Sequence, residues 1–105
     1  MKNLLYLFLL LPQIFLAQTG FAKGNELYRK NQFQEAVVQY ESVLKTNKQS
    51  AELYFNLGNS YYKLNKVAPA IYNFEKALLL KPNDKDILNN LAFAQKMQID
   101  EVKEV

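Results

Sequence analysis

The sequence predicts an all-α fold in which antiparallel helix hairpins stack as a short right-handed α-solenoid of about five helices. First, the chain matches itself after a shift of 34 residues, with nine identities: Ala17/Ala51, Phe21/Phe55, Gly24/Gly58, Asn25/Asn59, Tyr28/Tyr62, Asn31/Asn65, Ala36/Ala70, Glu41/Glu75 and Leu44/Leu78. Second, apolar residues recur every three or four positions, as on one face of a helix: Leu53, Leu57, Tyr61 and Leu64. Third, small residues stand at one place in three successive periods: Gly24, Gly58 and Ala92.

Residues 1–17 are predicted to be a secretory signal peptide that lies outside this fold. Lys2 gives a positive start, an apolar run from Leu4 to Phe15 follows, and Ala17 offers a small residue at a cleavage point. The run is shorter than the roughly 20 residues of a membrane span. We therefore expect export to the periplasm or cell envelope, with cleavage after Ala17. The alternative is an uncleaved N-terminal anchor.

Two full repeats are expected to follow, at about 17–50 and about 51–84. The first is predicted to hold helices at about 19–30 and 33–46, and the second at about 50–64 and 67–80. Asn65 is suited to end a helix in the left-handed conformation, and Asn31 stands at the same place one period earlier. Pro69 then falls in the first turn of the next helix, where a missing N–H is harmless.

A closing helix is predicted over residues 85–98, after Pro82-Asn83-Asp84 ends one helix and caps the next. We expect Ile87, Leu88, Leu91 and Ala94 to lie on one side and to cover Leu78. Residues 99–105 are interpreted as a linker or tail. The folded domain is therefore expected to span residues 18–98.

The recurring glycine is interpreted as a close approach of two helices. If each period is an antiparallel hairpin, Gly58 faces Ala70 and Phe74, and a larger side chain there would push the backbones apart. A glycine inside a helix otherwise costs about 1 kcal/mol relative to alanine, so its recurrence favours a packing role.

The composition argues against catalysis and against metal or cofactor binding. Cysteine and histidine are both absent, which removes thiolate nucleophiles, imidazole acid-base chemistry and nearly all transition-metal sites. The net charge is +3, and the cations are scattered without a basic run interleaved with aromatics. We therefore expect no enzyme activity, no cofactor, no metal and no nucleic-acid partner.

One segment resembles the tetratricopeptide repeat. The pattern Tyr54-x-x-Leu57-Gly58-x-x-Tyr61, then Ala70-x-x-x-Phe74, Ala77 and Pro82, is similar to that signature, with Tyr54 in place of its tryptophan. More narrowly, the run from Ile87 to Ala94 followed by Ile99-Asp100-Glu101 is similar to the N-terminal part of the Bat-type aerotolerance proteins of Bacteroides-like bacteria. That resemblance implies a membrane-associated complex of the cell envelope as the setting.

The first helix of each repeat is expected to line the concave side and to carry a peptide-binding stripe. Spacings of four, seven and eight place on that stripe Phe21, Asn25, Tyr28, Arg29, Phe55, Asn59, Tyr62 and Lys63, extended by Asn56, Asn89, Asn90 and Phe93. Amides can donate to and accept from a peptide backbone, while aromatic rings bury its side chains. The alternative is that Phe21 and Phe55 pack between neighbouring first helices and that the asparagines are solvated.

The resemblance also implies a specific peptide mode, a clamp that holds a C-terminal carboxylate with lysines, an arginine and asparagines. Asn25 and Asn56 fall where two of the clamp asparagines would lie. However, Phe21 and Asp86 replace lysines, and Asn90 stands where the arginine would be. We therefore expect that this groove does not bind free C-termini in that way.

The sequence thus predicts a non-catalytic protein-interaction scaffold of the bacterial cell envelope that binds an extended peptide on its concave face. Two alternatives stay open. One is an accessory enzyme domain built on Tyr62, Lys63 and Glu52. The other is a structural self-association module without a peptide ligand, with a homodimer formed through the fifth helix.

Overall fold

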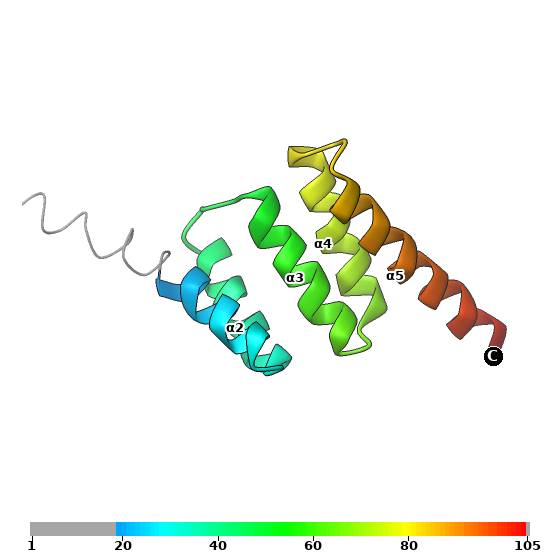
Figure 1. The fold of residues 1–105 in the computed structure, drawn as a ribbon, viewed down its shortest axis with the longest axis horizontal. Coiled ribbons are helices and arrows are strands. Elements are labelled where there is room, and N and C mark those ends of the chain that lie inside the picture. The colour runs from blue at the N-terminus through cyan, green and yellow to red at the C-terminus, as the bar shows by residue number, and fades with distance from the viewer. Residues whose placement is uncertain (1–18, 105) are drawn as a thin grey trace, which may run out of the picture.

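The computed structural model describes residues 19–104, and all regular structure in that range is helical. An N-terminal helix covers residues 19–29 of the described part. It is followed by α2 (Phe33–Leu44), α3 (Ala51–Lys63), α4 (Val67–Leu80) and α5 (Lys85–Glu104). Successive helices lie side by side along the molecule (Figure 1). The predicted all-α solenoid is confirmed, whereas the predicted signal peptide falls outside the described residues.

Each hairpin turns at an asparagine, as predicted. Asn31 and Asn65 both have φ of 60°, the left-handed region that asparagine tolerates. At the second turn the N–H of Lys66 donates to the carbonyl of Tyr61 at 2.9 Å, and the N–H of Asn65 donates to that of Tyr62 at 3.0 Å. These two bonds form a Schellman motif, which satisfies the last carbonyls of α3.

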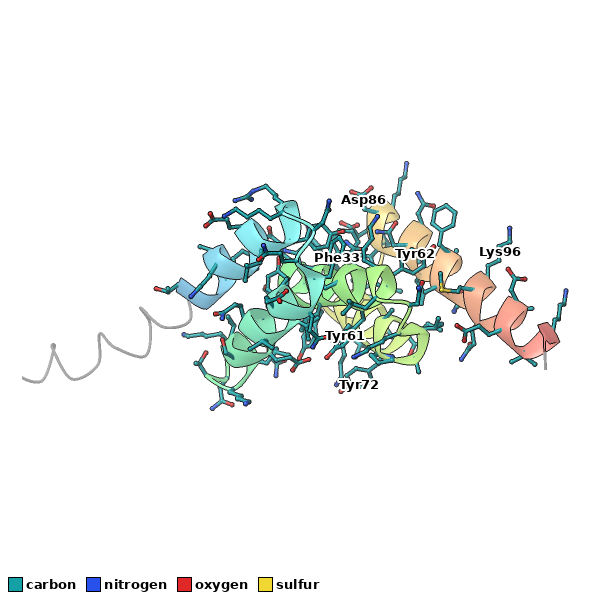
Figure 2. The ribbon with its side chains drawn as sticks, turned by 90° about the horizontal axis from the view of Figure 1, so that it is seen from below. Phe33, Tyr61, Tyr62, Tyr72, Asp86 and Lys96 are labelled. Carbon is teal, nitrogen blue, oxygen red and sulfur yellow. The ribbon has the colours of Figure 1, made fainter. Side chains whose placement is uncertain are left out.

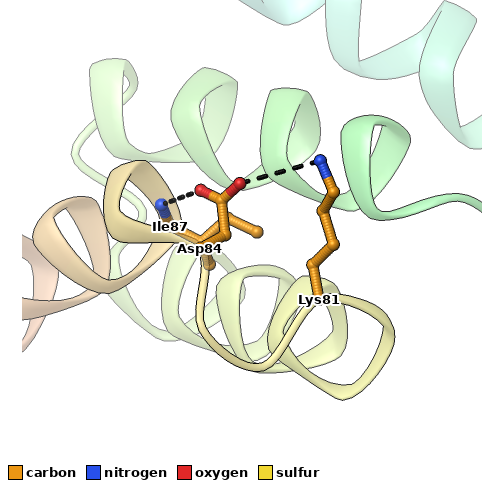
Figure 3. Close-up of polar contacts among 3 residues, drawn as sticks. All are labelled: Lys81, Asp84 and Ile87. Carbon is orange, nitrogen blue, oxygen red and sulfur yellow. Dashed lines mark hydrogen bonds and ion pairs between the residues drawn. The ribbon is translucent and has the colours of Figure 1, made fainter.

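The connections between hairpins use side-chain caps. The Ser50 hydroxyl accepts from the Leu53 N–H at 3.0 Å at the start of α3. At the start of α5, Asp84 accepts from the Ile87 N–H at 3.0 Å and pairs with Lys81 at 3.8 Å (Figure 3). The predicted cap after Pro82 is confirmed. Asn47 is a third left-handed residue, with φ of 62°, which the sequence analysis did not predict.

Two hydrophobic clusters form a core that runs across the hairpins. The first joins the N-terminal helix, α2 and α3, and its buried members are Ala36, Val37, Tyr40, Val43, Leu53 and Leu57. The second joins α3, α4 and α5, and its buried members are Tyr54, Ala70, Phe74, Ala77, Ile87, Leu91 and Ala94. Since α3 contributes to both, the core continues from one hairpin to the next.

The recurring glycines lie where two helices of a hairpin meet an aromatic ring. A Cβ atom at Gly58 would lie 2.6 Å from the ring of Phe74, and one at Gly24 would lie 2.5 Å from the ring of Tyr40. Gly58 and Phe74 thus meet as predicted, and Ala70 lies in the same cluster as that ring. The two repeats therefore share the whole glycine–aromatic contact, and not only the glycine.

The fifth helix differs from the prediction in two ways. It continues to Glu104 rather than ending near Gln98, because residues 99–104 contain neither glycine nor proline to stop it. Leu88 does not join the buried side: it is 45% exposed, whereas Ile87, Leu91 and Ala94 are buried.

Among the described helices, none has the length and apolar character needed to span a membrane.

Candidate functional site

The N-terminal helix, α3 and α5 are the first helices of successive periods, and we call the surface that they share the first-helix face. Two asparagine pairs link these helices. Asn56 donates from Nδ2 to Oδ1 of Asn25 at 3.0 Å, and Asn90 donates from Nδ2 to Oδ1 of Asn59 at 2.8 Å. Both pairs join residues 31 positions apart, and the second pair is the first shifted by one period. We call them the amide pairs.

The first amide pair has an additional donor from the core. The Tyr40 hydroxyl donates to Oδ1 of Asn25 at 2.6 Å, and burial raises the pKa of Tyr40 to about 12. The phenol therefore stays protonated and remains a donor across the physiological range. Phe74 stands at the equivalent place one period later, so the second amide pair has no such support.

Each amide pair keeps one donor and one acceptor for a ligand. Within residues 19–104, the hydrogen bonds use Oδ1 of Asn25 and Asn59 and Nδ2 of Asn56 and Asn90. The opposite ends of the same amides, an NH₂ group and a carbonyl oxygen in each pair, are left available. A peptide residue offers the complementary C=O and N–H on one edge of an extended backbone.

The amide pairs line two adjoining hollows on the first-helix face. One has a volume of about 240 Å³ and is lined by Asn25, Tyr28, Arg29, Tyr40, Glu52 and Asn56. The other has a volume of about 260 Å³ and is lined by Tyr28, Asn59, Tyr62, Lys63, Asn90 and Phe93. Tyr28 belongs to both. Its ring is held edge-on against Phe33, with centroids 5.1 Å apart. We call the two hollows together the groove.

Nine of the twelve residues predicted on the stripe line the groove, and Phe21, Phe55 and Asn89 do not. The Phe21 ring packs on Tyr40 with centroids 6.1 Å apart, and the Phe55 ring packs on Phe74 at 6.0 Å. Both rings therefore pack against the core clusters, each on the second helix of its own hairpin. These rings thus cover the contacts made possible by Gly24 and Gly58, and Phe55 also lines a separate hollow with Glu52 and Asp86.

The groove also holds residues that the stripe did not include. Tyr40 reaches it from α2, and Glu52 lies in its first hollow. Tyr40 has the sequence signal of a core residue, since it repeats as Phe74, so only the tertiary contact with Asn25 reveals its polar role. Asn89 was expected on the stripe, but it lines neither hollow.

The residues of the accessory-enzyme alternative are not gathered at one point. Tyr62 and Lys63 line one hollow, whereas Glu52 lines the other. In the described part of the chain, no group of three or more acidic side chains is arranged to hold a metal ion. The groove presents hydrogen-bond donors, hydrogen-bond acceptors and aromatic surface, which are the features of a binding site for a ligand.

Comparison with known families matches most of the domain. A model described as TPR repeat matches residues 24–65, and one described as tetratricopeptide repeat matches residues 51–84. No curated protein matches the chain. Tetratricopeptide repeats generally mediate interactions between proteins, and they are typically non-catalytic. With its two hairpins, its glycine–aromatic contacts and these two matches, the chain belongs to the tetratricopeptide-repeat family.

Proposed function

We propose that this protein is a non-catalytic scaffold that binds an extended peptide segment of a protein partner in the groove. The observation that carries the proposal is the repetition of the amide pairs. Each pair leaves one amide donor and one amide acceptor available beside aromatic side chains. Two such pairs, one period apart, suit an extended backbone that crosses the first helices. A small rigid ligand would contact only one of the two pairs.

The proposed setting is the cell envelope. Its support is the signal-like sequence of residues 1–17 and the resemblance of residues 87–101 to Bat-type aerotolerance proteins, which favours a membrane-associated complex. Fractionation of cells that express the full chain, with N-terminal sequencing of the recovered protein, tests this location. Recovery of an uncut chain from the cytoplasm would contradict it.

The test of peptide binding compares two exposed aromatic side chains. Phe93, on α5, is 60% exposed and lines the groove, and Tyr72, on α4, is 58% exposed. Tyr72 lies on the opposite side of the molecule from Tyr62 (Figure 2). Peptides selected from a random display library on the wild-type chain are expected to lose about tenfold or more in affinity on Phe93→Ala, because aromatic anchors commonly contribute more than 1 kcal/mol.

Tyr72→Ala is the matched control and is expected to bind the selected peptides as the wild type does. Both changes remove an aromatic ring of similar exposure, so neither should alter folding much. Equal losses in the two variants would show that the effect is not local to the groove. Peptides that bind Phe93→Ala undiminished would place the binding surface elsewhere.

We infer a second role, self-association, for the exposed side of α5. Leu88, Ile99 and Val102 are 45%, 55% and 70% exposed, and their spacing follows a heptad stripe, as in helices that pair. The expected partner is α5 of a second copy, which has the same stripe. Sedimentation equilibrium should show a dimer that the double variant Ile99→Ser/Val102→Ser converts to monomer, and a wild-type monomer at high concentration would exclude it.

A further inference from the structure

Two rows of opposite charge border the amide pairs. Glu52 and Asp86 stand one period apart in the first turns of α3 and α5. Arg29 and Lys63 stand one period apart at the other ends of the first helices. All four side chains are exposed. The two salt bridges within residues 19–104 involve other residues, so these four charges are available to a ligand. We call them the acidic row and the basic row.

The amide pairs lie between the two rows. Along α3, Glu52 precedes Asn56 by four residues and Lys63 follows Asn59 by four, which is about 6 Å of helix rise on either side. The whole distance from Glu52 to Lys63 is about 16 Å. Asp86 and Asn90 are likewise separated by four residues on α5. A backbone held by the amide pairs would therefore have an acidic row on one flank and a basic row on the other, both within reach of long side chains.

The alternation of an extended chain determines which side chains meet which row. When one edge of a strand faces the groove, successive side chains point to opposite flanks. Neighbouring residues would then meet opposite charges. A slip by one residue exchanges the flanks for every side chain, so a peptide with strictly alternating charge always has a favourable register.

Resting on the proposed function, we propose that the groove selects extended segments whose neighbouring side chains alternate in charge, with basic side chains toward Glu52 and Asp86 and acidic ones toward Arg29 and Lys63. The amide pairs hold the backbone of any sequence that has a free N–H at the bound positions. The charged rows then supply specificity. A free C-terminal carboxylate is not required.

The test uses two capped octapeptides of identical composition. In one, lysine and glutamate alternate, and in the other, four lysines precede four glutamates. Acetyl and amide caps remove the terminal charges. In the block peptide about half of the charged side chains meet a row of like charge. Since one exposed ion pair changes affinity by a factor of about 2 to 5, we expect the alternating peptide to bind about fivefold tighter or more, measured by titration calorimetry at low salt.

A charge reversal makes the test specific to the rows. Arg29→Glu/Lys63→Glu leaves two acidic rows, so it should prefer capped octalysine to the alternating peptide, which reverses the order of the wild type. Lys45→Glu/Lys76→Glu is the control, because it changes the net charge by the same amount on α4 and at the end of α2. It should keep the preference for the alternating peptide.

The outcomes separate this inference from the proposed function. Equal affinity of wild type for the alternating and block peptides, with both bound in the groove, would overturn the charge selection and leave peptide binding standing. Loss of the preference in both double variants would also overturn it, because the effect would then follow net charge. Failure of library-selected peptides to depend on Phe93 would instead count against the groove itself.

Discussion

At the scale of single residues, the glycine that recurs in each period sets how closely a hairpin can pack. Because a Cβ at Gly58 would lie 2.6 Å from the buried ring of Phe74, we expect Gly58→Leu to destabilise the fold by about 1 to 3 kcal/mol or more through overpacking. Thermal unfolding followed by circular dichroism measures the loss. Lys66→Ala is a control of near-neutral effect, since Lys66 is exposed, and an unchanged melting temperature in Gly58→Leu would contradict the hairpin contact.

The residues of the groove could be predicted only in part. The period identified Asn25 and Asn59 as equivalent, but it could not show that they pair with Asn56 and Asn90, because a hydrogen bond across 31 residues depends on how two helices dock. It also placed Phe21 in the open, although its ring lies on Tyr40. Helical spacing predicts the face of the helix on which a residue lies, whereas the direction of a long side chain also depends on the neighbouring helix.

At the scale of elements, the hairpin turns depend on one left-handed residue each. Asn65 has φ of 60°, a conformation that costs an alanine about 1 kcal/mol or more and a glycine little. We therefore expect Asn65→Ala to lower stability by about 1 kcal/mol, and Asn65→Gly to leave it unchanged or raised. Urea unfolding measures both. Asn89→Ala, in the middle of α5 and exposed, is the matched control, and equal effects of the two Asn65 variants would contradict the role of the turn.

The predicted helix boundaries agree closely with the structure where a particular residue ends or caps the helix. Asn31, Asn65 and Asp84 act as turns or caps at the expected places, and the structure adds Ser50 as the cap of α3. The end of α5 was misplaced because the prediction relied on the lack of a packing partner beyond Gln98. A helix that has already formed extends at little cost, so exposed residues can continue it.

At the scale of the whole molecule, neighbouring hairpins stabilise one another by burying their apolar faces together, and α5 covers the last of these faces. The second core cluster includes Ile87, Leu91 and Ala94 of α5 packed with Phe74 and Ala77. A repeat array buries each apolar face only against its neighbour, and fewer than three units are marginal. The chain therefore depends on α5 as a structural element as well as on its contribution to the groove.

Two truncations separate these roles of α5. Deletion of residues 85–105 removes the buried side chains, so we expect a large drop in melting temperature or self-association through the uncovered cluster. Deletion of residues 99–105 removes Ile99 and Val102, which are 55% and 70% exposed, and should leave the melting temperature nearly unchanged at concentrations where the wild type is monomeric. Calorimetry with light scattering measures both. A stable, monodisperse monomer after the longer deletion would show that the two hairpins suffice, and α5 would then be needed only for the part of the groove that Asn90 and Phe93 supply.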